Sequence, residues 1–204
     1  PDKDVSNFIR ALIVLAVMAV MAFVGVFATK WDDSIYGEDD DDTPVALPGT
    51  TDEMVVTGDA AIAAPAEGTY VAMKDIQDDI FSSGALGTCF GMKPSNNVIT
   101  SPVTGIINSV ALTKHAITIY GSNGEQVMVH IGLDSVKLNG MGIRTFVKPG
   151  MKVRAGEKIA EYKKAMFETE GIDDTVITIL LNPDAYKNVT VDSSDMKSVI
   201  KAEK

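Results

Sequence analysis

The chain has 204 residues, 46% of them hydrophobic and 23% charged, and a formal net charge of −10 at pH 7. This acidic balance lacks the basic surface that nucleic-acid binding requires, so we expect no nucleic-acid partner. The single cysteine, Cys89, excludes an intrachain disulfide and fits a reducing compartment. Because the chain begins with Pro1 rather than Met, we expect a processed product or a piece of a longer protein.

Residues 1–30 contain an uncharged apolar stretch, 11–29, between Arg10 and Lys30. As a helix it would extend roughly 28 Å, about the thickness of the hydrocarbon core of a bilayer. A signal peptide is the main alternative, but its apolar region is usually shorter and follows a basic segment, whereas Asp2 and Asp4 precede this one. We therefore predict one transmembrane helix over 11–29.

Residues 31–58 are predicted to form an acidic linker. They hold nine acidic residues, including the run 38–42, and no Lys or Arg. Few large apolar side chains are present, so this segment cannot bury enough surface to offset its ordering entropy. We predict a disordered, solvated tether. Since it carries a net charge of −9, residues 59–204 are left nearly neutral.

The sequence pattern of residues 59–204 predicts one all-β domain, an antiparallel sandwich or barrel hybrid. Short β-branched and apolar runs alternate there with Gly, Pro and Asn. Short helical segments are expected at 75–81 and 165–171. Many short strands are expected, for example Thr69–Met73, Val98–Thr100, Gly105–Leu112, Ala116–Tyr120, Gln126–Ile131, Lys158–Tyr162 and Thr175–Leu180.

A three-residue repeat follows, with aliphatic residues that should point inward and glycines that allow tight turns. Similar spacing occurs in lipoyl and biotinyl carrier domains. Those domains present their modified lysine as Met-Lys-Met or Asp-Lys-Ala, and no Met-Lys pair of this chain has that context. A swinging-arm carrier is therefore disfavoured. The repeat consists of Val147, Gly150, Val153, Gly156 and Ile159.

Both histidines, His115 and His130, lie in the stretch 111–136, on either side of the turn residues 120–125. This pattern predicts a β-hairpin. A two- or four-residue loop would place the histidines directly opposite, with Cβ atoms roughly 5 Å apart, and a turn at Asn123-Gly124 would make them diagonal neighbours at roughly 7 Å. An odd-length loop would break this alignment. Two converging imidazoles can share a phosphoryl group or a metal, whereas unrelated strand histidines would only bond locally.

The residues around His130 resemble a known signature. Gly124-Glu-Gln-Val-Met-Val-His130-Ile-Gly132-Leu-Asp134 is similar to the phosphorylation site of glucose-type IIA domains (EIIA type 1) of the bacterial phosphoenolpyruvate-dependent sugar phosphotransferase system, and Thr113-Lys-His115-Ala to their second-histidine motif. The resemblance runs from about Ile62 to Ile200 and includes Ala64-Pro65-x-x-Gly68, Lys93-Pro94 and Ser101-Pro102-Val103-x-Gly105.

The resemblance implies the duplicated hybrid motif as the fold and His130 as the phosphoryl acceptor. His115 would donate a hydrogen bond to the transferring oxygens. Thr113, two residues earlier on the expected strand face, could orient the His115 ring. Gly132 would keep the space beside His130 open. By resemblance Asp134 and Asp78 border the site, although a turn-stabilising role for Asp134 is equally open.

The family docks partner proteins on an aromatic patch around the histidines. Here Phe81 remains aromatic, while Ala111, Ile117 and Met128 stand at the other matching positions. Ser135 and the pair Thr88-Cys89 also depart from the usual Thr and Asp-Gly. Phosphoryl transfer is therefore the firmer inference, and regulatory binding of other enzymes the weaker one.

We expect no required cofactor. His115 and His130 supply only two zinc ligands, too few for a catalytic zinc site, which excludes zinc peptidases of the lysostaphin type. Zinc would bind only where a partner residue or a nearby carboxylate completes the shell. The chain also lacks a P-loop, so it is not expected to bind ATP.

Together these features predict the C-terminal part of a sugar permease: the last helix of a IIC membrane domain, a tether and a cytoplasmic IIA domain, at the cell membrane. The domain would take phosphate from the histidine phosphocarrier protein and pass it to a cysteine of the IIB domain. The alternative is a membrane-tethered regulatory binding domain that signals sugar status. No segment identifies the sugar.

Overall fold

The computed structural model describes residues 55–204, so the predicted helix over 11–29 and most of the predicted linker lie outside the described residues. Within residues 55–204 no helix is long and apolar enough to cross a membrane. The linker boundary differs from the prediction. Val56 is buried, and Thr57 N donates a hydrogen bond to Asn123 O at 2.8 Å, because this segment packs beside a hairpin turn.

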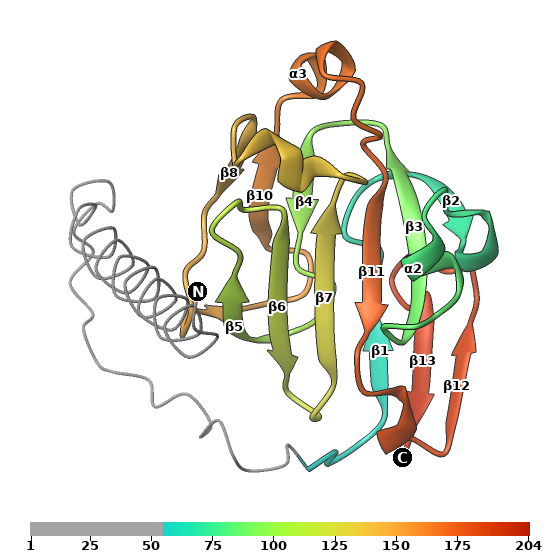
Figure 1. Cartoon of the computed structure of the whole chain (residues 1–204). Helices are drawn as coiled ribbons and strands as arrows, with labels where there is room; N and C mark the ends of the chain where they lie inside the picture. Colours follow the sequence, from blue (N-terminus) through green and yellow to red (C-terminus); the bar gives the residue numbers. More distant parts are fainter. Residues whose placement is uncertain (1–54) are drawn as a thin grey trace, which may run out of the picture. The chain divides into compact units, whose positions relative to one another are not determined.

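All strand pairings are antiparallel, which confirms the all-β prediction. A seven-stranded sheet has the order β2-β3-β11-β7-β6-β5-β9, and two three-stranded sheets have the orders β1-β13-β12 and β4-β10-β8 (Figure 1). The strands are β1 (Ala60–Ile62), β2 (Gly68–Ala72), β3 (Thr88–Pro94), β4 (Val98–Thr100), β5 (Gly105–Val110), β6 (Ala116–Gly121), β7 (Gln126–Ile131), β8 (Ile143–Thr145), β9 (Lys152–Val153), β10 (Lys158–Tyr162), β11 (Val176–Leu180), β12 (Asn188–Val191) and β13 (Ile200–Glu203).

The short helices lie between strands: η1 (Met73–Asp75), α2 (Asp79–Ser82), η2 (Ser135–Leu138), α3 (Lys164–Thr169) and η3 (Pro183–Ala185). The single helical segment predicted over 75–81 is instead divided in two. Asp78 causes the division, because its side chain caps a new helix by accepting hydrogen bonds from Ile80 N and Phe81 N at 2.9 and 3.2 Å.

The seven-stranded sheet buries both of its faces around β11. One face joins the main core through β-strand residues such as Val127, Val129 and Ile131. The other face carries a smaller apolar cluster in which Phe81 of α2 and Ile76 cover Ile177 and Ile179 of β11. Figure 1 shows α2 lying against β3 beside that strand. This cluster brings α2 to the edge of the site described below.

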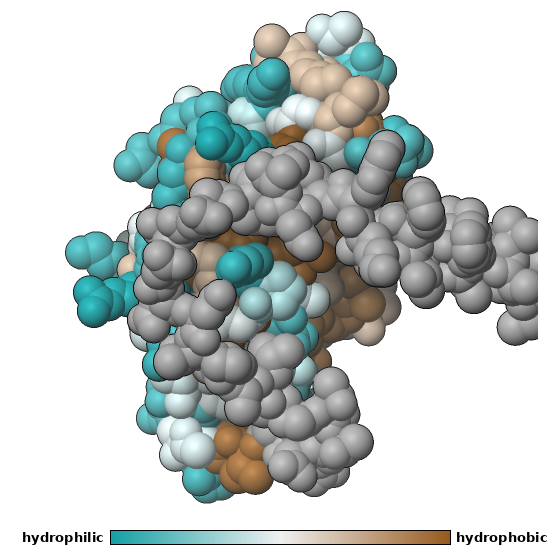
Figure 2. Space-filling model, turned by 90° about the vertical axis from the view of Figure 1, so that its left-hand side faces the viewer, coloured by the Kyte–Doolittle hydropathy of each residue, from teal (hydrophilic) through white to brown (hydrophobic). Residues whose placement is uncertain are grey.

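The three-residue repeat behaves as predicted. Val147, Val153 and Ile159 are buried, while Gly150 and Gly156 adopt φ values of +89° and +83°. In the surface view from the side of β5 and β8, hydrophobic and hydrophilic residues both appear toward the middle of the visible face, and hydrophilic ones lie along its left edge (Figure 2).

Thr178, at the centre of β11, offers a test of the core packing. Its side chain is fully buried and its hydroxyl has no hydrogen-bond partner within residues 55–204. Thr178→Val keeps the shape and removes the unpaired hydroxyl, so we expect the free energy of unfolding to rise by about 1 kcal/mol. Urea unfolding measures the change. Thr175→Val is the control and should destabilise, because the Thr175 hydroxyl donates to Asp173 at 2.5 Å.

Candidate functional site

The β6–β7 hairpin has a register that differs from the expected one. Gly121 N donates to Glu125 O at 2.7 Å, which leaves the three-residue loop 122–124, with Gly124 at φ +93°. An odd loop moves the pairing by one residue, so Ala116 and not His115 lies opposite His130. The prediction that strand alternation places both histidines on one face is therefore wrong in its mechanism.

The two imidazoles nevertheless meet, because His115 lies in the turn that precedes β6. The His115 and His130 ring centroids are 5.0 Å apart with an interplanar angle of 77°. His115 O accepts a hydrogen bond from Ile131 N at 2.7 Å, and Lys114 takes a left-handed conformation with φ 59°. The turn frees the His115 side chain from strand alternation and directs it toward His130.

Thr113 lies in the same turn and not on a strand face. Its Oγ1 is 2.5 Å from His115 Nδ1, as expected for a residue that orients this ring. When the hydroxyl donates to Nδ1, the His115 proton is on Nε2. The Nε2–H group is then free to donate to a third group placed beside His130.

His130 occupies a pocket formed by apolar and aromatic side chains. The Phe81 ring contacts its edge, with centroids 5.0 Å apart, and β11 places Ile177 next to it in the ladder. Its Nδ1 atom is buried and has no hydrogen-bond partner within residues 55–204, although the Gly132 backbone lies near enough to the ring to favour its protonation. Nε2 is therefore the atom that an incoming group can reach.

Burial, and then the neighbouring His115, lower the pKa of His130 to about 4, while Asp78 and the Gly132 backbone oppose this shift. Burial also lowers the pKa of His115. Both rings are consequently neutral at pH 7. A neutral imidazole keeps the lone pair that a nucleophile or a metal ligand needs.

The two carboxylates predicted to border the site, Asp78 and Asp134, have different surroundings. Asp78 caps α2 and lies close enough to His130 for its charge to raise the pKa of that ring. Asp134 follows β7 with φ 60°, is exposed, and forms an ion pair with Lys137 at 2.6 Å. The structure therefore brings Asp78 to His130 and favours the turn-stabilising reading of Asp134.

Gly132 serves a different purpose from the expected one. At φ +75°, a Cβ atom would lie 2.5 Å from the Phe167 ring and 3.1 Å from Asp173 O. The glycine thus permits close packing behind His130, rather than keeping open the space in front of it. Ser135, which stands where a Thr was expected, donates to Ile131 O at 2.5 Å and Gly132 O at 3.1 Å.

The predicted docking residues are only partly at the surface. Ile117 is fully buried in the main core, so its assignment to a docking patch is wrong: strand alternation turns it inward. Phe81 is 7% exposed, and Ala111 and Met128 are half-buried. Two exposed apolar residues were not among those predicted: Ile80, 57% exposed beside Phe81, and Leu112, fully exposed beside Thr113. Apolar residues in turns next to the motif residues were the available signal.

Among residues 55–204, no group of three or more His, Cys, Asp and Glu side chains could hold a metal ion. The arrangement offers one accessible neutral nucleophile, His130 Nε2, with a second imidazole as hydrogen-bond donor beside it. Such a pair suits transfer of a group with developing negative charge on its oxygens.

Comparison with known proteins agrees with this chemistry. Residues 60–186 match the family model described as phosphoenolpyruvate-dependent sugar phosphotransferase system, EIIA 1. The glucose-specific EIIA component of Staphylococcus aureus is 34% identical over 148 residues, which cover 72% of this chain and 88% of that protein. The solved structure of glucose permease IIA from Mycoplasma capricolum has a TM-score of 0.60 and 27% identity, covering 71% of this chain and 94% of that one.

Two longer relatives also match this chain. The raffinose carrier protein of Pediococcus pentosaceus is 36% identical over 136 residues, 65% of this chain and 21% of that protein. The β-glucoside-specific EIIBCA component of Bacillus subtilis is 34% identical over 125 residues, 61% of this chain and 20% of that protein. The chain therefore spans about a fifth of these longer relatives.

Proposed function

The chain belongs to the EIIA 1 family of the phosphoenolpyruvate-dependent sugar phosphotransferase system, and from that premise we propose that His130 is the residue that carries its phosphoryl group. The domain is a phosphotransferase component that acts in sugar uptake. The accessibility of His130 Nε2, with Nδ1 buried, is the observation that supports this assignment most directly.

In the first step, the neutral His130 Nε2 attacks the phosphorus of a phosphohistidine on the histidine phosphocarrier protein. The N–P bond of the donor breaks as the new N–P bond forms, and the His130 proton stays on Nδ1, near the Gly132 backbone. His115, oriented by Thr113, donates from Nε2 to a phosphoryl oxygen. In the second step a cysteine thiolate of a IIB domain takes the phosphoryl group and His130 returns to its neutral form.

The proposed partners dock over the histidines. Ile80 and Leu112 offer exposed apolar contacts next to Phe81 and Thr113, and half-buried Met128 lies on the outer face of β7 with His130. No resident cofactor takes part in this scheme. Zinc would bind tightly only where a partner supplied further ligands beside the two imidazoles.

The longer relatives support a permease context. One is named a raffinose carrier protein, the other is named an EIIBCA component, and the match covers only 21% and 20% of their lengths. We propose that residues 11–29 span the membrane as the end of a IIC domain, that 31–54 tether the IIA domain on the cytoplasmic side, and that the domain adopts the family's sandwich-like hybrid fold. A full-length chain that remained monomeric and soluble without detergent would contradict the membrane assignment.

The test of the function is transfer of labelled phosphate from the phosphorylated histidine phosphocarrier protein to the purified chain. We expect one phosphoryl group per chain, labile in acid and stable in alkali, and its loss on addition of a IIB domain with its cysteine intact. A IIB domain lacking that cysteine is the control. Absence of any label on a folded chain would contradict the proposal.

A further inference from the structure

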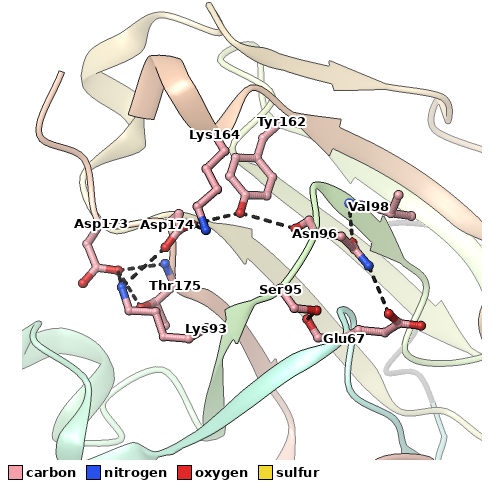
Figure 3. Close-up of polar contacts among 10 residues, drawn as sticks. All are labelled: Glu67, Lys93, Ser95, Asn96, Val98, Tyr162, Lys164, Asp173, Asp174 and Thr175. Carbon is pink, nitrogen blue, oxygen red and sulfur yellow. Dashed lines mark hydrogen bonds and ion pairs between the residues drawn. The ribbon is translucent and has the colours of Figure 1, made fainter. Parts of the chain in front are cut away.

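An ion pair links Lys93 of β3 to Asp173 and Asp174, in the turn that leads into β11 (Figure 3). Lys93 Nζ lies 2.6 Å from Asp173 Oδ1 and 3.5 Å from Asp174 Oδ1. Asp173 Oδ1 also accepts hydrogen bonds from Thr175 N at 2.8 Å and Thr175 Oγ1 at 2.5 Å, and Asp174 Oδ2 accepts one from the Tyr162 hydroxyl at 2.9 Å. These contacts close the turn 173–175 and tie it to β3.

The same turn holds the backbone that follows His130. Gly132 N donates to Thr175 O at 3.0 Å, and Leu133 N donates to Asp173 O at 2.8 Å. Both bonds continue the β7–β11 ladder past its last pair, Ile131 and Val176. The backbone acceptors of the Gly132 turn therefore come from the turn 173–175, which the Lys93–Asp173 ion pair holds in place.

We infer that Asp173, held by Lys93, is a positioning residue for His130, an inference that rests on the proposed function. The Gly132 backbone lies near enough to the His130 ring to raise its pKa. A shift of the Gly132–Leu133 backbone would move that group and change the direction in which Nε2 points. Phosphoryl transfer needs the attacking atom aligned with the bond that breaks, so a small misplacement lowers the rate.

A direct role for Lys93 is the competing explanation, because its side chain is 47% exposed and could contact a docked partner. The two roles predict different kinetics. A contact to the partner would alter the KM for the phosphocarrier in Lys93→Met only. A positioning role would lower kcat in both Lys93→Met and Asp173→Ala, and the double variant would be no worse than the single ones.

The kinetic test uses the full chain in detergent with phosphorylated phosphocarrier as donor. We expect Lys93→Met and Asp173→Ala each to lower kcat about tenfold with unchanged KM, and Lys93→Arg to recover most of the loss. Lys158→Met is a matched control. Lys158 and Glu161 form an ion pair of 2.7 Å on β10. Their side chains are 41% and 30% exposed, against 47% and 35% for Lys93 and Asp173. Loss of the Lys158–Glu161 pair should leave kcat unchanged.

A second measurement needs no phosphoryl chemistry. In the unphosphorylated chain, Asp173→Ala should speed hydrogen exchange of the Gly132 and Leu133 amides about tenfold and shift the ring ¹⁵N signals of His130, while Lys158→Met should not. Unchanged kcat or unchanged exchange in Asp173→Ala would overturn the inference, as would a KM effect confined to Lys93→Met. If even the unaltered chain accepts no phosphate, the proposed function fails, and the exchange data still decide whether the turn holds Gly132.

Discussion

We expect replacement of His130 with alanine to abolish phosphorylation of the chain by the phosphocarrier. His130 Nε2 is the accessible nitrogen of the more deeply placed ring, and its depressed pKa keeps it neutral and nucleophilic. We do not expect His115 to replace it, because the His115 Nδ1 atom is bonded to the Thr113 hydroxyl and Nε2 then carries the proton. We expect the rate to fall by several orders of magnitude.

Transfer of radiolabelled phosphate measures this loss, with circular dichroism as the check that the variant is folded. Thr178→Val is the matched control. It has no proposed role in phosphoryl transfer and is expected to stabilise the domain, so this variant should accept phosphate normally. If His130→Ala still formed an acid-labile phosphoprotein while a His115 variant did not, the two roles would be reversed.

Replacing His115 with glutamine separates acceptance from onward transfer. Glutamine keeps a donor near the phosphoryl oxygens, so labelling of His130 should stay within about tenfold of the unaltered rate. Passage to the IIB cysteine should fall about 100-fold, the usual scale for loss of an oriented donor that stabilises developing charge. Glutamine cannot share charge or take up a proton as imidazole does, and it lacks the alignment that Thr113 imposes on His115.

Single-turnover chase of pre-labelled chain with a IIB domain measures the second step separately from the first. His115→Ala is the comparison and should impair both steps, since it leaves no donor. Equal rates of onward transfer for His115→Gln and the unaltered chain would show that His115 does not contribute to this step.

Local sequence patterns were sufficient for the regular strands. The limits of β4, β7 and β10 agree with the predicted ranges, because alternating or β-branched runs bounded by turn residues determine such strands locally. β3 was missed. Its residues 89–92 are all buried, and they include Gly91, so the strand shows neither alternation nor high β-propensity.

The site was predicted in composition but not in geometry. The motifs identified His130, His115 and Thr113, and the structure places the three together. They did not reveal the three-residue loop 122–124, which moves the hairpin register by one residue. With this register, a His115 within the strand would have pointed to the opposite face from His130. They also assigned Ile117 to the surface, although its strand parity, once the register is known, points it into the core.

Residue identity alone thus determined which chemistry is available: two imidazoles, one hydroxyl that orients a ring, and no third metal ligand among the histidines. Tertiary structure decided how that chemistry is directed. Burial against Phe81 lowers the pKa of His130, and a left-handed residue before β6 directs His115 toward it. Lys93 and Asp173, 80 residues apart in the sequence, form the ion pair at the turn that accepts the Gly132 and Leu133 backbone hydrogen bonds. These effects arise from contacts between distant segments, and desolvation and backbone alignment depend on such contacts rather than on neighbouring residues in the chain.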